Sequence, residues 1–200
     1  QRNTVGYPAY SFYAFQQVYD VNGMPIEGLY IDRSGDGGNV AGNDENKYYY
    51  KKPAPDVVMG LSSSFRYKKF DAMVSARVNL GNYVYNNVAS DRAVYSSLYN
   101  QSGFFNNLPT QVNRTRFNRP QYWSDFYIEN ASFLRLDNIS IGYNVDKLFT
   151  EKLDARFSLA VQNAFVITKY NGLDPEVDGG IDNNIYPRAR TFVLGINVNF

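Results

Sequence analysis

Residues 57–80 read VVMGLSSSFRYKKFDAMVSARVNL, and apolar and polar side chains alternate through most of this stretch. In 57–67 every second residue from Val57 is apolar except Ser63, and the residues between them are mostly small or polar. The alternation resumes in 70–80 after Lys68-Lys69. A period of two predicts strands with one apolar face. Two such strands joined by so short a turn predict an antiparallel hairpin.

Four further stretches are expected to form strands. Residues 155–167 and 192–200 are apolar at alternate positions. In 133–145 the apolar positions change phase near Asp137, where a β-bulge would restore the alternation. The N-terminal SFYAFQQVY, residues 11–19, carries aromatic side chains on both faces, so its register stays open.

The composition favours strands and excludes several kinds of site. The chain has 18 Tyr and 14 Phe, which favour strands and turns over helices. It has no Cys and no His, which excludes disulfides, Cys/His zinc sites and His-based catalysis. The 20 basic and 19 acidic residues nearly balance, so charge makes no case for nucleic-acid binding. Because Gln1 does not begin a signal peptide, we expect a mature chain or a fragment.

Strand and loop lengths favour a transmembrane β-barrel over a soluble β-sandwich. Soluble strands most often have about 5 to 6 residues, whereas a tilted membrane strand needs about 9 to 11. Outer-membrane barrels also alternate short periplasmic turns with long extracellular loops. With the last strand running into the periplasm, the connections at 68–69 and 146–154 are periplasmic. The longer connections 20–56, 81–132 and 168–189 are then extracellular.

Aromatic residues are expected near both ends of these strands, as in the belts at membrane interfaces. The expected periplasmic belt consists of Phe65, Tyr67, Phe70, Tyr143, Phe157 and Phe200. The expected outer belt consists of Phe133, Phe165 and Phe192.

Three stretches of the chain resemble the C-terminal end of the SusC/RagA-type TonB-dependent outer-membrane transporters of Bacteroidetes. They are SFLRLDNISIGYNV (132–145), AVQNAFVITKYNGLDPEV (160–177) and GIDNNIYPRARTFVLGINVNF (180–200). Upstream, Gly6-Tyr7-Pro8, the loop 32–37 and residues 53–56 are also similar to that family. The resemblance covers nearly the whole chain, and its last 70 or so residues are the most specific part.

The resemblance implies an all-β fold: an antiparallel transmembrane segment with about the last six strands of a barrel of about 22. Residues 1–200 would be the C-terminal part of the barrel, without the plug domain and TonB box. The implied partners are the rest of the barrel polypeptide with its plug, a SusD-like surface lipoprotein acting as a lid, TonB through the absent N-terminal region, and outer-membrane lipid. The implied location is the bacterial outer membrane, which the chain crosses several times.

The loop Asp32-Arg-Ser-Gly-Asp-Gly37 has the spacing that opens a calcium-binding loop. Asp32, Ser34 and Asp36 would supply oxygen ligands at alternate positions, which suit a hard cation. The acidic twelfth ligand is missing, because position 43 is Asn, although Asp44 or Glu45 could replace it. A Gly/Asp-rich surface turn is the alternative.

The long connection 81–132 is rich in aromatic and Asn residues, which suit either sugar binding or contact with a lid protein. The alternative is that the loop uses its rings as a small core of its own. The candidate contact residues are Tyr95, Tyr99, Phe104, Phe105, Tyr122 and Trp123.

No constellation of residues predicts catalysis, so we expect no enzyme. Asp174, Glu176 and Asp178 lie close together in sequence, but nothing places two of them across a cleft, as glycoside hydrolysis requires. Arg66, Asp71, Arg77, Arg156 and Gln162 are expected to face the barrel interior, where a role in pairing competes with one in lining a transport path.

By resemblance, the expected function is TonB-dependent import of a nutrient too large for porins, an oligosaccharide or a peptide, beneath a SusD-like lid. The alternatives are a siderophore-type receptor without a lid and a soluble carbohydrate-binding β-sandwich. The last strand is expected to carry the signal for barrel assembly, an alternating apolar run with a terminal aromatic residue. Its residues are Phe192, Leu194, Ile196, Val198 and Phe200.

Overall fold

A computed structural model of the chain describes residues 1–99, 101–147, 153–183 and 186–199. The chain divides into two compact units. We call residues 56–80, 132–169 and 187–200 the strand unit, and residues 1–55, 81–131 and 170–186 the loop unit. None of the helices in the described part of the chain has the length and apolar character needed to span a bilayer.

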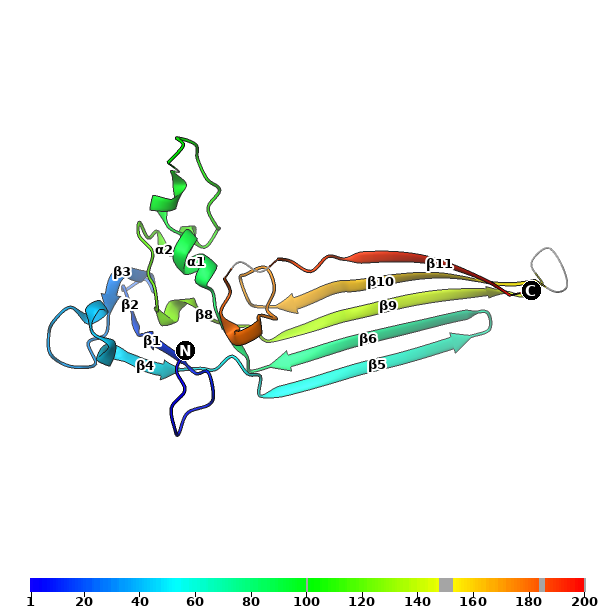
Figure 1. Cartoon of the computed structure of the whole chain (residues 1–200), viewed down its shortest axis with the longest axis horizontal. Coiled ribbons are helices and arrows are strands. Elements are labelled where there is room, and N and C mark those ends of the chain that lie inside the picture. The colour runs from blue at the N-terminus through cyan, green and yellow to red at the C-terminus, as the bar shows by residue number, and fades with distance from the viewer. Residues whose placement is uncertain (100, 148–152, 184–185, 200) are drawn as a thin grey trace. The chain divides into compact units, whose positions relative to one another are not determined.

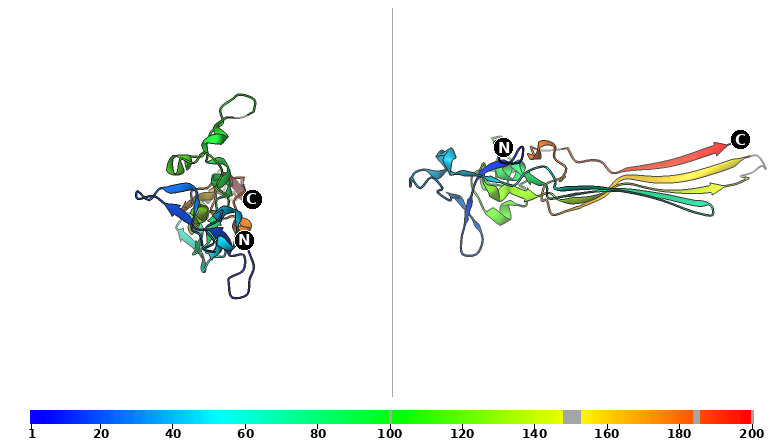
Figure 2. Two further views of the ribbon diagram at one scale, coloured as in Figure 1. Left: turned by 90° about the vertical axis from the view of Figure 1, so that its left-hand side faces the viewer. Right: turned by 90° about the horizontal axis from the view of Figure 1, so that it is seen from below.

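The strand unit is one antiparallel sheet of five long strands, in the order β11-β10-β9-β6-β5 (Figure 1). The right-hand view of Figure 2 shows the same strands side by side from below. Within the described residues the sheet does not close, and β5 and β11 are its edges. The strands are β5 (Val57–Tyr67), β6 (Phe70–Leu80), β9 (Phe133–Val145), β10 (Asp154–Thr168) and β11 (Thr191–Asn199).

The register confirms the hairpin and the bulge. β5 pairs with β6 from Val57↔Leu80 to Tyr67↔Phe70, and Lys68 in the turn has a left-handed φ of 52°. Between β6 and β9 the pairing shifts from Ser75↔Asn138 to Ala76↔Leu136, which leaves Asp137 as the extra residue. A second irregularity lies opposite, where β10 shifts between Gln162 and Phe165.

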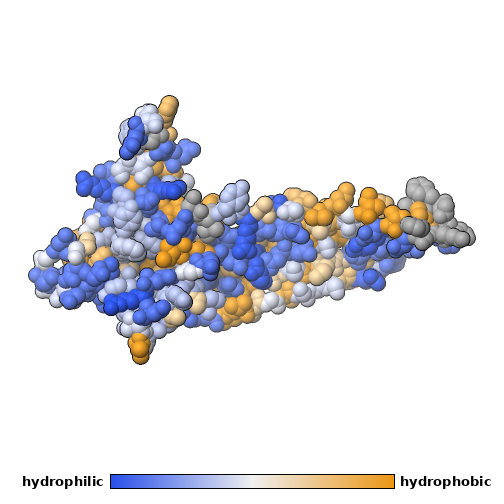
Figure 3. All heavy atoms as spheres, in the orientation of Figure 1, coloured by the Kyte–Doolittle hydropathy of each residue, from blue (hydrophilic) through white to orange (hydrophobic). Residues whose placement is uncertain are grey.

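The same register separates the two faces of the sheet. One row of directly paired residues runs Tyr67, Phe70, Tyr143, Phe157 and Ile196. The next row on this face is Phe65, Ala72, Ile141, Leu159 and Leu194. The opposite face carries Arg66, Asp71, Gly142, Ser158 and Gly195 in one row. Hydrophobic side chains accordingly gather in patches along the strand unit (Figure 3).

The aromatic residues follow the expected belts in part. The rings of Phe70 and Tyr143 contact each other, with centroids 4.7 Å apart. Phe133 differs from the expectation, because it pairs with Asn79 and Thr168, on the polar face, and is buried. Phe200 lies outside the described residues.

The loop unit is built from short elements around its own core. Its strands are β1 (Phe12–Phe15), β2 (Gln17–Tyr19), β3 (Pro25–Tyr30), β4 (Lys47–Tyr50), β7 (Tyr83–Tyr85) and β8 (Ile128–Asn130). They form three two-stranded sheets, β1-β4, β2-β3 and β7-β8. The α-helices are α1 (Asn87–Arg92) and α2 (Val112–Thr115). The short 3-10 helices are η1 (Val40–Gly42), η2 (Asp44–Asn46), η3 (Tyr95–Leu98), η4 (Asp125–Tyr127) and η5 (Asp178–Gly180).

The core of the loop unit joins segments that are distant in sequence. It consists of Phe12, Ala14, Tyr85, Ala89, Ala93, Val112, Tyr127 and Ile128. The stretch 11–19 therefore forms β1 and β2 of the loop unit and does not join the long strands. For this reason the long sheet has five strands within the described residues, where about six were expected.

Candidate functional site

The polar face of the strand unit carries paired charges. Arg77 and Asp137 form a two-pronged ion pair, with Nε–Oδ2 and Nη2–Oδ1 distances of 2.8 and 2.9 Å. The bulge at Asp137 therefore presents a carboxylate to the neighbouring strand. Arg156 bonds Asp71 through Nε and Nη2, so these two predicted inward-facing residues bond each other.

Gly142 leaves room for the second of these pairs. A Cβ at this position would lie 2.5 Å from Arg156 Nη2 and 2.6 Å from Asp71 Oδ2. Both distances are shorter than real Cβ contacts, so any larger residue would have to displace the pair. In the Gly-Tyr dipeptide at 142–143, the glycine is thus needed to leave space for the ion pair on the polar face. The tyrosine places its ring against Phe70 on the apolar face.

A buried polar network connects the segments of the loop unit. Gln17 Nε2 donates to the main-chain oxygens of Val18, Ile26 and Leu29. Its Oε1 accepts from Ser124 Oγ at 2.8 Å, and its main-chain N–H donates to Asp125 Oδ1 at 2.9 Å. Because these bonds join residues up to 108 positions apart, they fix the N-terminal segment against the 81–131 connection.

Burial in this network changes the acidity of tyrosines. Tyr30 is buried, and burial raises its pKa to about 12. Its hydroxyl donates to Gln121 Oε1 at 3.0 Å. Burial, and then the hydrogen bond to Asp125, raise the pKa of Tyr48 well above its ordinary value.

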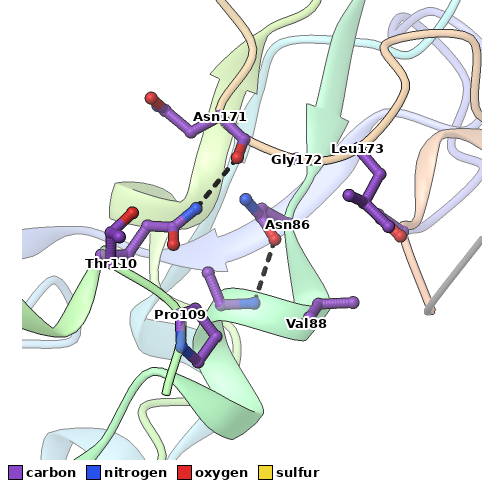
Figure 4. A pocket seen from close by; sticks show the side chains of 10 residues that line it. Asn86, Val88, Pro109, Thr110, Asn171, Gly172 and Leu173 are labelled. Carbon is purple, nitrogen blue, oxygen red and sulfur yellow. Dashed lines mark hydrogen bonds between the residues drawn. The ribbon is translucent and has the colours of Figure 1, made fainter. Parts of the chain in front are cut away.

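The loop unit contains a pocket of about 330 Å³. Figure 4 shows it between α1, the turn before α2 and the connection after β10. Its apolar lining comes from Val88, Ala89, Pro109 and Leu173. Its polar lining comes from Asn86, Thr110, Gln111, Asn171 and Asp182, and Gly172 completes the wall. An apolar pocket with a few fixed polar groups is typical of a ligand site.

Hydrogen bonds hold the polar groups of this pocket in place. Gln111 Nε2 donates to the main-chain oxygen of Asn171 at 3.0 Å, and Asn86 Oδ1 accepts from the N–H of Ala89 at 3.0 Å (Figure 4). Asp182 is 3% exposed, and its Oδ2 accepts from the Tyr170 hydroxyl at 2.7 Å. Burial, and then this hydrogen bond, raise the pKa of Tyr170 strongly.

Gly172 permits the close packing of the pocket wall. A Cβ here would lie 2.5 Å from Cζ and Oη of Tyr170, and closer still to Cε1. Tyr170 is buried with Val84 and Ala131. In Tyr-Asn-Gly at 170–172, Tyr170 thus supplies a buried ring and Asn171 an amide of the pocket lining. Gly172 is needed because the Tyr170 ring packs closely against its backbone.

The six predicted contact aromatics remain at the surface of the loop unit. Their exposed fractions run from 43% to 72%, whereas Tyr85 and Tyr127 form the core. The rings of Tyr99 and Phe105 pack against each other, with centroids 5.2 Å apart. These six are Tyr95, Tyr99, Phe104, Phe105, Tyr122 and Trp123, and their role as contacts stays a prediction.

Tyr122 and Trp123 also make defined contacts. The Tyr122 hydroxyl bonds Asp91 Oδ1 at 2.6 Å, and this bond raises the pKa of Tyr122. Trp123 has a left-handed φ of 63°, and its N–H donates to the hydroxyl of Tyr85 at 3.0 Å. Trp123 is thus held by its backbone while half of its side chain stays exposed.

In the predicted calcium loop the carboxylates bond to the loop itself. Asp32 Oδ1 accepts from Ser34 Oγ and from the N–H of Gly35, and its Oδ2 accepts from the N–H of Gly37. These main-chain bonds lower the pKa of Asp32. Asp36 Oδ1 accepts from the N–H of Gly38. The described residues contain no group of three or more acidic side chains placed to hold a metal, so calcium at Asp32, Ser34 and Asp36 stays a prediction.

The residues of the expected assembly signal lie on one face of β11. Phe192, Leu194, Ile196 and Val198 are all exposed and share the apolar face of the sheet. The fifth residue, Phe200, lies outside the described part.

No pattern in the sequence predicted the pocket. Its polar residues come from 86, 110–111, 171 and 182, which no local pattern connects. The only available signal was Lys-Tyr-Asn-Gly-Leu-Asp-Pro-Glu at 169–176, part of the family resemblance.

Comparison with known proteins relates this geometry to a family. The chain is 47% identical over 206 aligned residues to the TonB-dependent receptor SusC of Bacteroides thetaiotaomicron, a match that covers 100% of the chain. The chain belongs to the SusC/RagA-type TonB-dependent receptors. It is also 29% identical, over 95% of its length, to the TonB-dependent receptor P3 of Formosa agariphila. No protein-family profile matches the chain.

The fold agrees with this family. A chain of the RagAB peptide transporter superimposes with a TM-score of 0.68 at 21% identity, over 95% of this chain. The chain spans about a fifth of the length of these receptors: 20% of SusC, 22% of P3 and 23% of the RagAB chain. The structure is thus a segment with the barrel-wall strands of a TonB-dependent receptor, and the relatives are named as receptors and transporters rather than enzymes.

Proposed function

We propose that the chain forms part of the wall and the outer loops of an outer-membrane importer that TonB energises. The proposal rests mainly on the sheet, which has one apolar and one polar face, in a chain that matches SusC along its whole length. The five strands have 11, 11, 13, 15 and 9 residues, enough to cross a bilayer at a tilt. The apolar face would contact lipid and the polar face the interior.

The connections support an orientation. Lys68 and Lys69 alone join β5 to β6, whereas the connections from β6 to β9 and from β10 to β11 contribute 81–131 and 170–186 to the loop unit. Outer-membrane barrels have short turns on the periplasmic side and long loops outside. The loop unit would therefore meet the ligand first.

The proposed cargo is a nutrient too large for porins, an oligosaccharide or a peptide, captured beneath a SusD-like lipoprotein. The pocket of amides and aliphatic side chains, and the exposed aromatics Tyr99, Phe104 and Phe105, support a role in contacting ligand or lid. A siderophore receptor without a lid is the second candidate. Co-purification of a surface lipoprotein with the full-length receptor would favour the first.

Deleting the gene in the bacterium that encodes it tests the function. Mass spectrometry of the medium would follow the depletion of oligosaccharides and peptides by the deletion strain, the complemented strain and wild type treated with a protonophore. We expect the deletion to stop the uptake of one class of oligomer while monomer uptake continues, and the protonophore to stop the uptake of that oligomer as well. Undiminished uptake of every oligomer, with lost growth on ferric siderophores, would favour the second candidate instead.

A further inference from the structure

We propose that Glu129 is the positioning residue of the pocket, and that the pocket binds an uncharged part of the ligand that carries hydrogen-bonding groups beside an apolar face. The inference rests on the proposed import function and adds to it the ligand chemistry and a residue behind the site. Glu129 lies on β8, is half-buried, and does not itself line the pocket.

One carboxylate holds two of the pocket asparagines. Glu129 Oε2 accepts from the main-chain N–H of Asn171 at 2.9 Å and from Asn171 Nδ2 at 2.6 Å. Its Oε1 accepts from Asn86 Nδ2 at 3.1 Å. Hydrogen bonds to an ionised acceptor are about twice as strong as those between neutral groups. Glu129 therefore fixes which way each amide points.

The hydrogen bonds that fix Asn171 also fix a third side-chain amide, that of Gln111. Gln111 Nε2 donates to the main-chain oxygen of Asn171, so the position of Gln111 depends on the segment that Glu129 holds. The side-chain oxygens Asn171 Oδ1 and Gln111 Oε1 accept no hydrogen bond from the described residues, so a ligand could donate to them. Pre-positioned acceptors avoid the entropy cost of ordering these side chains when the ligand binds.

The pocket lining disfavours a charged group on the ligand. Among the described residues of the lining, Asp182 is the one that is ionisable, and it is buried and already bonded to the Tyr170 hydroxyl. A charged ligand group would lose its hydration here without gaining a strong partner. A volume of about 330 Å³ suits a small portion of an oligomer rather than a whole one. Hydroxyls of a neutral oligosaccharide and amides of a neutral peptide share the required chemistry.

The test uses the full-length receptor, purified in detergent, with two uncharged probes measured by calorimetry. One probe is maltodextrin, and the other is a set of Ala/Ser peptides blocked at both ends. The variants are Glu129→Gln, Glu129→Asp and the control Glu27→Gln. Glu27 also uses both carboxylate oxygens, which accept from the main-chain N–H groups of Asn118 and Arg119, away from the pocket.

Glu129→Gln replaces one acceptor oxygen by a donor NH2 that must face another donor. We expect the dissociation constant of the bound probe to rise about tenfold while the number of sites stays the same. Glu129→Asp keeps both acceptors and should recover part of the affinity, and Glu27→Gln should bind like wild type. Whichever probe binds shows whether the ligand is an oligosaccharide or a peptide.

Two results would overturn the inference. If the wild type and both Glu129 variants bind the probe with equal affinity, Glu129 is not a positioning residue. If Glu129→Gln does not fold, the comparison of Glu129→Asp with wild type decides whether it is. If the wild-type receptor binds neither uncharged probe, the proposed ligand chemistry is wrong. Failure of the proposed function is a separate result, because it is seen as unchanged uptake in the deletion strain.

Discussion

Gly172→Ala should disrupt the pocket through a ring that lies beneath it. The new Cβ would stand 2.5 Å from Tyr170 Cζ and Oη, whereas carbon atoms pack best at about 3.5 to 4.0 Å, so the ring must move by about 1 Å. Such a shift is enough to break the 2.7 Å bond from Tyr170 to Asp182. Overpacking costs about 1 to 3 kcal/mol, and a lost bond to a charged group about 1.5 to 3 kcal/mol. We expect a total of about 3 kcal/mol.

Hydrogen exchange on the full-length receptor measures this cost locally. About 3 kcal/mol corresponds to roughly a hundredfold faster exchange, expected at amides around β7, β8 and 170–182. Gly60→Ala is the matched control, because a Cβ at Gly60 meets nothing within 4 Å. Exchange in Gly172→Ala that is as slow as in wild type and Gly60→Ala would refute the packing argument.

Two further predictions concern pH and membrane assembly. Burial raises the pKa of Tyr30 from its ordinary 10.0 to about 12, so the neutral side chain stabilises the loop unit fully below pH 10. This contribution of about 2 to 3 kcal/mol is lost as the pH rises through 12. Exchange near Tyr30 should accelerate over this window, and much less so in Tyr30→Phe; equal acceleration in both would contradict the assignment. Leu194→Arg on the apolar face should reduce the assembled barrel, since Arg at the bilayer midplane costs about 2 to 4 kcal/mol. Val193→Arg, next to it on the polar face, should assemble at a near-normal yield, and equal loss in both variants would be evidence against the faces assigned to β11.

The long strands could be predicted from the sequence because each carries the same signal many times. The expected bounds 57–67, 70–80 and 133–145 are those of β5, β6 and β9. A slip of one residue would exchange the apolar and polar faces of the whole strand, so the register is strongly specified. The bulge at Asp137 could be predicted for the same reason, since a change of phase needs an extra residue.

The loop unit could not be predicted in this way. In β1, Phe12, Ala14 and Phe15 are buried and Tyr13 is half-buried, so neither face of the strand is fully open to solvent. A period of two carries no information there. The pocket depends on contacts such as Glu129–Asn86 and Glu129–Asn171, which span 43 and 42 residues and leave no local pattern.

The aromatic residues show the same limit. Tyr85, Tyr95, Tyr122 and Tyr127 all lie in one connection, yet two are buried and two are exposed. The difference follows from the partners that the fold brings to each ring, such as the core around Tyr85 and Tyr127. Composition alone left open whether the rings of this connection form a core or contact a partner. The fold places Tyr85 and Tyr127 in the core and leaves the six predicted contact residues exposed.

Spin labels at successive positions 156 to 162 of β10, in the full-length receptor in lipid, would measure directly which side chains face lipid. We expect Phe157, Leu159 and Val161 to face lipid and Arg156 and Ser158 to face the interior. Oxygen concentrates in the bilayer, so its collision rate with the label should alternate with a period of two along the strand. We expect maxima at 157, 159 and 161. Uniform rates, or maxima at 156, 158 and 160, would contradict this expectation.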